Sequence, residues 1–279
     1  MKIENRTFIV SGGSSGLGLA TVQNLLQARS YVAILDKQAP STEPSGFCSP
    51  RSTADSDSAG PSTLPASESR LRYFKVNLVE VDQISFVLDE VVSWSKETGA
   101  MLGGIIHCAG IGELEQLIDN KGSPHSAKTW DMTFAVNVSG TFHLTRLALK
   151  HFINVPKEEA DGERGVIVMV SSSVAYDGTA GQTAYAASKG AIRSMTLPMA
   201  RDLARYGIRV VTIAPGPFTS PLTDRWPERV TRSVHQDMLL YPKRFGFPTE
   251  FADTVHWILK TPYVNGESIK LTAGIRAKI

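Results

Sequence analysis

Short apolar runs alternate along the chain with stretches in which apolar residues recur every three or four positions. The runs are typical of buried strands and occupy residues 7–10, 31–35, 71–76, 104–110 (ending in a glycine turn), 166–170, 208–213 and 266–271. The helical spacing occupies residues 19–26, 81–94, 130–152, 184–206 and 251–259. This alternation predicts an α/β fold in which one doubly wound parallel sheet forms a single domain over residues 1–279.

Two segments interrupt this pattern. Residues 39–70 hold nine Ser, five Pro and three Thr among 32 residues, which predicts a mobile, low-complexity surface insertion. A tolerated loop accounts for this composition, and a site of phosphorylation or partner binding is the alternative. Residues 218–247 are rich in Pro, aromatic and charged residues, and we expect a lobe that lies over the ligand site and binds substrate.

The composition narrows the class of protein. Of the 279 residues, 42% are hydrophobic and 20% are charged, so the chain can bury a full core. The net charge of +2 gives no reason to expect nucleic acid or an anionic membrane as a partner, and no apolar run approaches the roughly 18 residues of a membrane span. Cys48, Cys108 and the six histidines show no metal-ligand spacing, so we expect no metal and no disulfide framework, which suits a reducing compartment.

The two ends of the sequence bear on location. Residues 8–10 begin the first strand so near the N-terminus that we expect no signal or transit peptide. Ala277-Lys278-Ile279 resembles a variant of the peroxisomal tripeptide, whose usual form is S-K-L. We therefore expect a peroxisomal location, with a cytoplasmic protein that carries a solvated tail as the alternative.

A glycine-rich turn separates the first strand from the first helix. It reads Ser11-Gly12-Gly13-Ser14-Ser15-Gly16-Leu17-Gly18. Glycines let the backbone approach a pyrophosphate closely, and the N-terminus of the helix that follows offers free N–H groups and a positive dipole. Strand, turn and helix together predict a phosphate-binding site.

Several other residues follow the predicted strands directly. They are Asp36, Asn77, the turn at 108–110, Ser172 and Pro215. Because ligands of a doubly wound sheet bind at the carboxyl ends of its strands, we expect these residues to meet in one site. A carboxylate at Asp36 can bond the ribose hydroxyls of NAD and would repel the 2′-phosphate of NADP. A helix-capping or turn aspartate is the alternative, and the adjacent Lys37 leaves the preference for NAD open.

Tyr185 and Lys189 are four residues apart on a predicted helix and so point the same way. A cation beside a phenol favours the phenolate and lowers its pKa, so such a pair can exchange a proton with an alcohol or a carbonyl. An exposed i,i+4 pair on an ordinary amphipathic helix is the alternative.

Taken together, these residues resemble the short-chain dehydrogenase/reductase family over nearly the whole chain outside 39–70. The glycine turn matches the family's T-G-x-x-x-G-x-G, residues 108–110 match its N-A-G turn, and residues 185–189 match its Y-x-x-x-K. The resemblance implies a Rossmann fold and the catalytic set Asn137, Ser172, Tyr185 and Lys189. Ser172 is selected among three adjacent serines because it lies 13 residues before the tyrosine.

A closer resemblance, through residues 212–222 and 263–271, is to a subgroup that oxidises 3-hydroxyacyl-CoA thioesters and hydroxysteroids. It implies NAD as the cofactor and a homotetramer, whose interface we expect at helices 130–152 and 184–206. The implied cofactor-binding residues are Gly12, Ser15, Gly16, Leu17, Gly18, Asp36, Asn77, Leu78, Cys108, Ala109, Gly110, Tyr185, Lys189, Pro215, Phe218 and Ser220. The implied substrate-binding residues are Ser172, Gln182 and Tyr185. Ser11, Asn77 and Ser220 depart from the usual Thr, Asp and Thr, but each keeps a hydrogen-bonding group.

The resemblance also implies a reaction, the interconversion of a secondary alcohol and a ketone. The substrate oxygen would sit between Ser172 and Tyr185, with Tyr185 as the acid or base. Lys189 would lower the pKa of Tyr185 and hold the nicotinamide ribose, and Asn137 would hold a water that relays the proton to solvent. Two alternatives remain: a tailoring reductase or epimerase of a secondary-metabolite pathway, which would use the same four residues, and a cofactor-binding scaffold subunit with little turnover.

Overall fold

The chain folds around one parallel sheet. The computed structural model describes residues 1–40, 70–158, 161–234 and 238–276. The core of the predicted insertion (41–69), Cys48 within it, and the tripeptide 277–279 lie outside the described residues. The sheet has seven strands in the order β3-β2-β1-β4-β5-β6-β7, and every neighbouring pair is parallel. This confirms the single-domain, doubly wound α/β fold predicted from the alternation of strands and helices.

The strand positions follow the apolar runs. They are β1 (Thr7–Ser11), β2 (Tyr31–Asp36), β3 (Leu71–Lys75), β4 (Leu102–His107), β5 (Gly165–Val170), β6 (Ile208–Pro215) and β7 (Ser268–Leu271). The β1, β4 and β6 strands are buried along their whole length. Strands that are buried on both faces consist of continuous apolar runs, which explains why the sequence predicted their positions.

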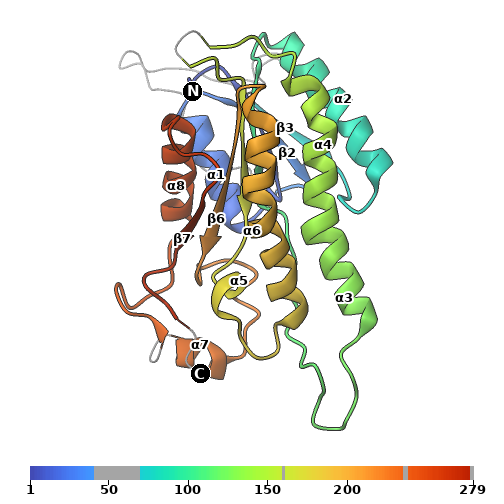
Figure 1. The fold of residues 1–279 in the computed structure, drawn as a ribbon, viewed down its shortest axis with the longest axis vertical. Helices are drawn as coiled ribbons and strands as arrows, with labels where there is room; N and C mark the ends of the chain where they lie inside the picture. The colour runs from blue at the N-terminus through green and yellow to red at the C-terminus, as the bar shows by residue number, and fades with distance from the viewer. Residues whose placement is uncertain (41–69, 159–160, 235–237, 277–279) are drawn as a thin grey trace, which may run out of the picture.

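Helices cover both faces of the sheet (Figure 1). They are α1 (Gly16–Gln27), α2 (Val81–Glu97), α3 (Ala127–Phe134), the π-helix η1 (Ala135–Gly140), α4 (Thr141–Phe152), α5 (Val174–Asp177), α6 (Thr183–Ala204), α7 (Glu228–Ser233) and α8 (Pro248–Lys260). One face packs against α2, α4 and α6, and the other packs against α1 and α8. No helix among the residues that the structure describes is long and apolar enough to cross a membrane.

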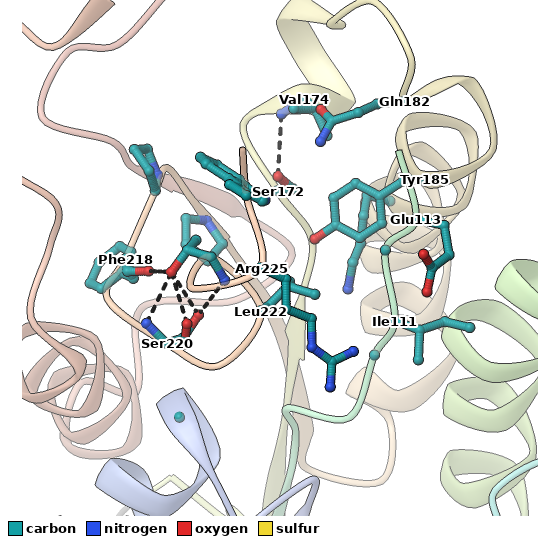
Figure 2. A pocket seen from close by; sticks show the side chains of 18 of the residues that line it. Ile111, Glu113, Ser172, Val174, Gln182, Tyr185, Phe218, Ser220, Leu222 and Arg225 are labelled. Carbon is teal, nitrogen blue, oxygen red and sulfur yellow. Dashed lines mark hydrogen bonds between the residues drawn. The ribbon is translucent and has the colours of Figure 1, made fainter. Parts of the chain in front are cut away.

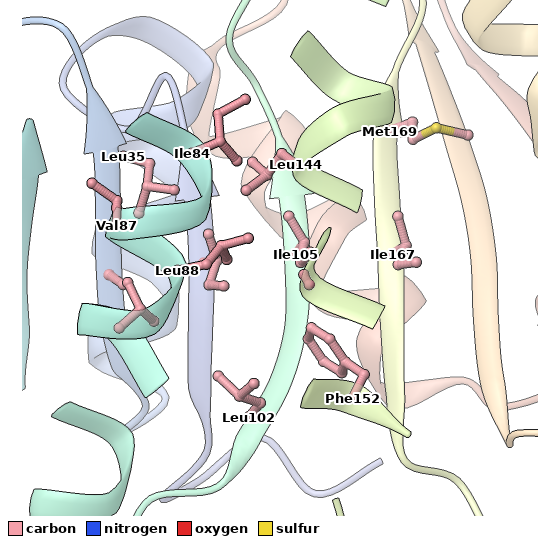
Figure 3. Packing of buried hydrophobic residues seen from close by; sticks show 14 of the residues in the cluster. Leu35, Ile84, Val87, Leu88, Leu102, Ile105, Leu144, Phe152, Ile167 and Met169 are labelled. Carbon is pink, nitrogen blue, oxygen red and sulfur yellow. The ribbon is translucent and has the colours of Figure 1, made fainter. Parts of the chain in front are cut away.

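Successive strand residues serve the two faces in turn. Ile105 of β4 belongs to the cluster under α2, α4 and α6, together with Leu88 and Phe152 (Figure 3). The next residue, Ile106, belongs to the cluster under α1 and α8. This period of two is the geometry of a β-strand, and both residues are fully buried. The result is a rigid double-sided core that fixes the carboxyl ends of the strands relative to one another.

The helix predicted at 130–152 differs from the observed structure. It is three pieces, α3, η1 and α4, because a π-helical turn interrupts the α-helical pattern at 135–140. The hydroxyl groups of Thr141 and Thr145 donate to the carbonyl oxygens of Asn137 and Thr141, 2.8 and 2.9 Å away. Such bonds from a side chain to the preceding turn bend helices, and π-turns occur frequently at functional sites.

Candidate active site

The glycine turn joins β1 to α1 with little room for side chains. Gly12 has a φ of +67°, and a Cβ there would lie 2.5 Å from the backbone nitrogen of Ala109. A Cβ at Gly18 would collide with the carbonyl of Gly12. Both positions therefore need glycine, one for its backbone conformation and both for close packing. The α1 helix begins directly after this turn, and no side chain caps its N-terminus.

A cleft of about 1230 Å³ opens at the carboxyl ends of the strands. Every cofactor- and substrate-binding residue that the sequence predicts lines it, which brings together segments from residue 12 to residue 220. Of the four predicted catalytic residues, Ser172, Tyr185 and Lys189 line the cleft, and Asn137 is buried behind its wall. The topology thus produces the convergence that the strand-end argument predicted.

The inner part of this cleft fits a dinucleotide. The glycine turn presents backbone rather than side chains, and the uncapped N-terminus of α1 faces it with free N–H groups. Asp36 ends β2 on the cleft wall, and its Oδ2 accepts the Ser14 N–H at 3.1 Å, which fixes the carboxylate beside the turn. Asn77 also lines the wall, although its Oδ1 already accepts a bond of 3.3 Å from the Val79 N–H.

Ser172, Tyr185 and Gln182 face the cleft from two elements (Figure 2). Ser172 follows the end of β5, and its Oγ accepts a bond of 3.4 Å from the Val174 N–H. Tyr185 lies in the first turn of α6, with its hydroxyl directed toward Ser172 in Figure 2. Lys189, one turn later, is buried, and its Nζ donates to the Val170 carbonyl at 2.8 Å.

Burial shifts the pKa values of both members of this pair. It raises the pKa of Tyr185 to about 12, against a smaller lowering by the Ser172 hydroxyl. It lowers the pKa of Lys189 to about 8. In the chain alone, desolvation therefore keeps the pKa of Tyr185 above its ordinary value, and the lowering of that pKa by Lys189 stays a prediction.

Asn137 holds the wall of the site together. Its Oδ1 accepts the Ile111 N–H at 2.9 Å, and its Nδ2 donates to the Ile111 carbonyl at 2.9 Å and to Ser188 Oγ at 3.0 Å. A Cβ at Gly110 would lie 3.3 Å from both Asn137 Oδ1 and Lys189 Nζ, so the two side chains flank one glycine. The π-helical turn η1 aims Asn137 at this point, and the side chain is 1% exposed.

The two titratable residues at the end of β4 are electrically neutral. Burial raises the pKa of the Cys108 thiol to about 12, so it is not a thiolate near neutrality. His107 is fully buried with its Nε2 2.9 Å from Thr145 Oγ1, and burial lowers its pKa to about 3. No group of three or more potential metal ligands occurs in the described ranges, from which 41–69, 159–160, 235–237 and 277–279 are missing.

Sequence reasoning missed several residues of this site. Gly112 packs against the Tyr185 ring, where a Cβ would lie 3.1 Å from the ring. Glu113, Arg225 and Arg229 line the outer part of the cleft. Gly112 and Glu113 stand directly beyond the predicted 108–110 turn, which is a signal, whereas nothing in the pattern marks which arginines of residues 218–247 reach the cleft.

Comparison with known proteins is consistent with this geometry. The family model described as short chain dehydrogenase matches residues 52–231. The 3-hydroxyacyl-CoA dehydrogenase type-2 of Mus musculus is 34% identical over 96% of this chain and 94% of its own length, and that of Drosophila melanogaster is 33% identical over 98% of both. The crystal structure of 3-hydroxyacyl-CoA dehydrogenase type-2 from Mycobacterium avium superimposes with a TM-score of 0.79 at 28% identity, over 100% of this chain and 99% of that one.

Proposed function

The chain belongs to the short-chain dehydrogenase family of oxidoreductases, and from that premise we propose that it interconverts a secondary alcohol and a ketone with NAD as its cofactor. The proposed substrate is a 3-hydroxyacyl-CoA thioester and its 3-oxo counterpart, with a hydroxysteroid as the second candidate. The observation that carries the proposal is the meeting of Ser172, Tyr185 and Lys189 on one wall of a cleft whose inner part fits a dinucleotide.

Ser172 and Tyr185 can hold the substrate oxygen between their hydroxyl groups. With a pKa near 12, Tyr185 carries its proton at neutral pH, so it is the acid that protonates a carbonyl oxygen during reduction. The Ser172 hydroxyl donates to the same oxygen and stabilises the negative charge that develops there. In the oxidation direction Tyr185 must first lose its proton, and the charge of Lys189 beside the ring stabilises the phenolate.

NAD, when bound, supplies or accepts the hydride of this reaction. We assign the pyrophosphate to the glycine turn and the α1 N-terminus, the adenosine ribose to Asp36, and the nicotinamide end to the wall that carries Lys189, Phe218 and Ser220. The carboxylate of Asp36 supports NAD rather than NADP, because it would repel a 2′-phosphate.

Asn137 has a positioning role in this proposal. Its amide ties the backbone after Gly110 to Ser188 on α6, one residue before Lys189. Because Tyr185 and Lys189 both lie on α6, movement of either element would shift this pair relative to the backbone after Gly110. The proton relay predicted from the sequence for Asn137 stays a prediction.

The names of the relatives support the proposed substrate class, since three of the similar proteins are called 3-hydroxyacyl-CoA dehydrogenase type-2. The volume of the cleft, about 1230 Å³, exceeds the upper end of ordinary small-ligand pockets, roughly 1,000 Å³, as a cofactor together with a long substrate requires.

NADH consumption with acetoacetyl-CoA tests the proposal, run beside a panel of ketosteroids and with NADPH in parallel. We expect Tyr185→Phe to lower kcat by about 10²- to 10⁴-fold, the usual contribution of a general acid, while NADH binding is retained. Tyr263→Phe is the matched control, because that ring is fully exposed. Near-normal turnover in Tyr185→Phe would contradict the mechanism, and a protein that binds NADH but reduces nothing on the panel would exclude the two proposed substrate classes.

We also propose that the protein forms a homotetramer through the helices at 127–152 and α6. Large apolar side chains are exposed on these helices, among them Trp130, Met132, Phe142 and Leu197. Light scattering after size exclusion measures the assembly. We expect a tetramer for the natural chain and a smaller species for Phe142→Glu, whereas Phe86→Glu, at an even more exposed position on α2, should leave the assembly unchanged.

A further inference from the structure

Two arginines of the segment that follows Ser220 line the outer part of the cleft. Arg225 precedes α7, and Arg229 lies in its first turn. In Figure 2 the Arg225 guanidinium reaches from the Ser220–Leu222 loop into the space before Ile111 and Glu113. Both side chains are exposed, and neither has a role in the reaction described above.

Neither guanidinium has an ion pair or hydrogen bond within the part of the chain that the structure describes. Other arginines of the same region do: Arg232 pairs with Glu228 at 2.6 Å, and Arg244 forms two bonds with Glu250 at 2.8 and 2.9 Å. The cleft wall therefore carries two positive charges whose donors are free for a ligand. A planar guanidinium with paired N–H groups matches the oxygens of a phosphate, so each is suited to an anion of that geometry.

The arginines stand beside an apolar surface. Val234 and Ile275 are buried in a small cluster against which Trp226, Val230 and Met238 pack. These five residues also line the cleft. A ligand that uses the whole outer part must therefore combine an apolar portion with negative charge.

We propose that Arg225 and Arg229 form the subsite that binds the phosphate groups of a coenzyme A thioester, while the neighbouring apolar residues contact its pantetheine arm. This inference rests on the proposed function and deepens it, because a hydroxysteroid would leave both charges unpaired. The subsite distinguishes a phosphorylated carrier from an uncharged substrate that presents the same 3-oxoacyl group to Ser172 and Tyr185.

Steady-state kinetics with three thioesters of acetoacetate tests this: the coenzyme A, 4′-phosphopantetheine and N-acetylcysteamine derivatives. We expect Arg225→Gln/Arg229→Gln to raise KM for acetoacetyl-CoA by at least 10-fold with kcat changed less than 2-fold, a smaller rise for the singly phosphorylated thioester, and no change for the uncharged one. Raising the ionic strength should increase KM for acetoacetyl-CoA in the natural chain and have little effect in the variant. Arg232→Gln, on the helix that carries Arg229 but paired with Glu228, should match the natural chain.

Titration calorimetry with free coenzyme A separates the subsite from the reaction. Arginine-dependent binding in a protein that turns over no thioester would support the subsite and contradict the proposed function. Equal KM values for acetoacetyl-CoA in the natural chain and the double variant would overturn the subsite and leave the proposed function standing. A rise in KM confined to NADH would also overturn it, since Arg225 would then serve the cofactor.

Discussion

The ammonium group of Lys189 lies 5.6 Å from the centroid of the Tyr185 ring and donates a hydrogen bond of 2.8 Å to the Val170 carbonyl. The ammonium group is therefore close enough to the ring for the two charges to interact, although no hydrogen bond joins the two residues. Burial disfavours the charged form of both groups and so moves their pKa values apart, lowering that of Lys189 to about 8 and raising that of Tyr185 to about 12. When two such groups are coupled, the pair loses its first proton at the lower of the two pKa values. This holds even if the reactive form is the one in which the other group has lost the proton.

This pairing predicts opposite pH profiles for the two reaction directions. Oxidation needs the pair with one proton removed, so its kcat/KM should rise about tenfold per pH unit up to about pH 8 and then level. Reduction needs both protons and should fall above the same pH. Initial rates from pH 6 to 10 in both directions measure this. In Lys189→Met the inflection for oxidation should move up toward about 12, the pKa of Tyr185, and an unmoved inflection would contradict the pairing.

Replacement of Asn137 should affect stability and turnover together. Asn137→Ala leaves the Ile111 N–H, the Ile111 carbonyl and the Ser188 hydroxyl without their partner. An unsatisfied buried group costs about 1–3 kcal/mol, so we expect a loss of about 2–4 kcal/mol in the free energy of unfolding, measured by urea denaturation. Ser188→Ala removes only one of the three bonds and should lose less. Stability in Asn137→Ala equal to that of the natural chain would show that these bonds do not hold the wall.

The carboxylate of Asp36 makes a prediction about the cofactor. Asp36→Asn keeps an oxygen for the Ser14 N–H but removes the charge. We expect the ratio of kcat/KM for NAD over NADP to fall at least tenfold, about 1.4 kcal/mol of discrimination. Lys37→Gln removes an exposed cation on the same wall, so the ratio should rise. If the two substitutions left the ratio unchanged, the adenosine ribose would have to bind elsewhere.

His107 predicts an acid limit for the fold. Its pKa is lowered to about 3 in the folded protein and is about 6.5 in the unfolded chain, so below pH 6.5 only the unfolded chain takes up the proton. Stability is therefore lost as the pH falls from 6.5 toward 3, by about 2 kcal/mol between pH 6.5 and 5 from this group alone.

His107→Gln, which can still bond Thr145, should remove that portion of the pH dependence. Urea denaturation at pH 7.5, 6.0 and 5.0 makes the comparison. Parallel curves for variant and natural chain would exclude His107 as the source.

The sheet and most of the site were predictable for a shared physical reason. Strands buried on both faces leave unbroken apolar runs, so β5 and β6 could be placed within two residues of their observed ends. Asp36 and Ser172 could be placed in one site because parallel strands bring their carboxyl ends to one edge. The short α5 and α7 helices and the π-turn at Asn137 left no such signal, because they depend on contacts between segments far apart in the chain.

The sequence predicted which residues line the site better than it predicted their pKa values and ion pairs. Spacing alone put Lys189 beside Tyr185, but the balance between attraction and desolvation depends on how deeply the structure buries each group. Arg225 and Arg229 present the same problem, since the sequence does not show that they line the cleft while Arg232, on the same segment, pairs with Glu228.

Because of the π-helical turn, the number of residues in η1, which carries Asn137, matters as much as which residues they are. Successive residues of an α-helix are rotated by about 100°, so deleting one residue between Ala135 and Gly140 would convert η1 into continuous α-helix and swing Asn137 away from Ile111 or misalign α4 against the sheet. A substitution in α4 changes one side chain and leaves the others where they are. Deletion of one residue from η1 rotates every later residue of the helix relative to the sheet. Chains that keep this active site should therefore keep a fixed number of residues between Phe134 and Thr141, even where the residues themselves vary.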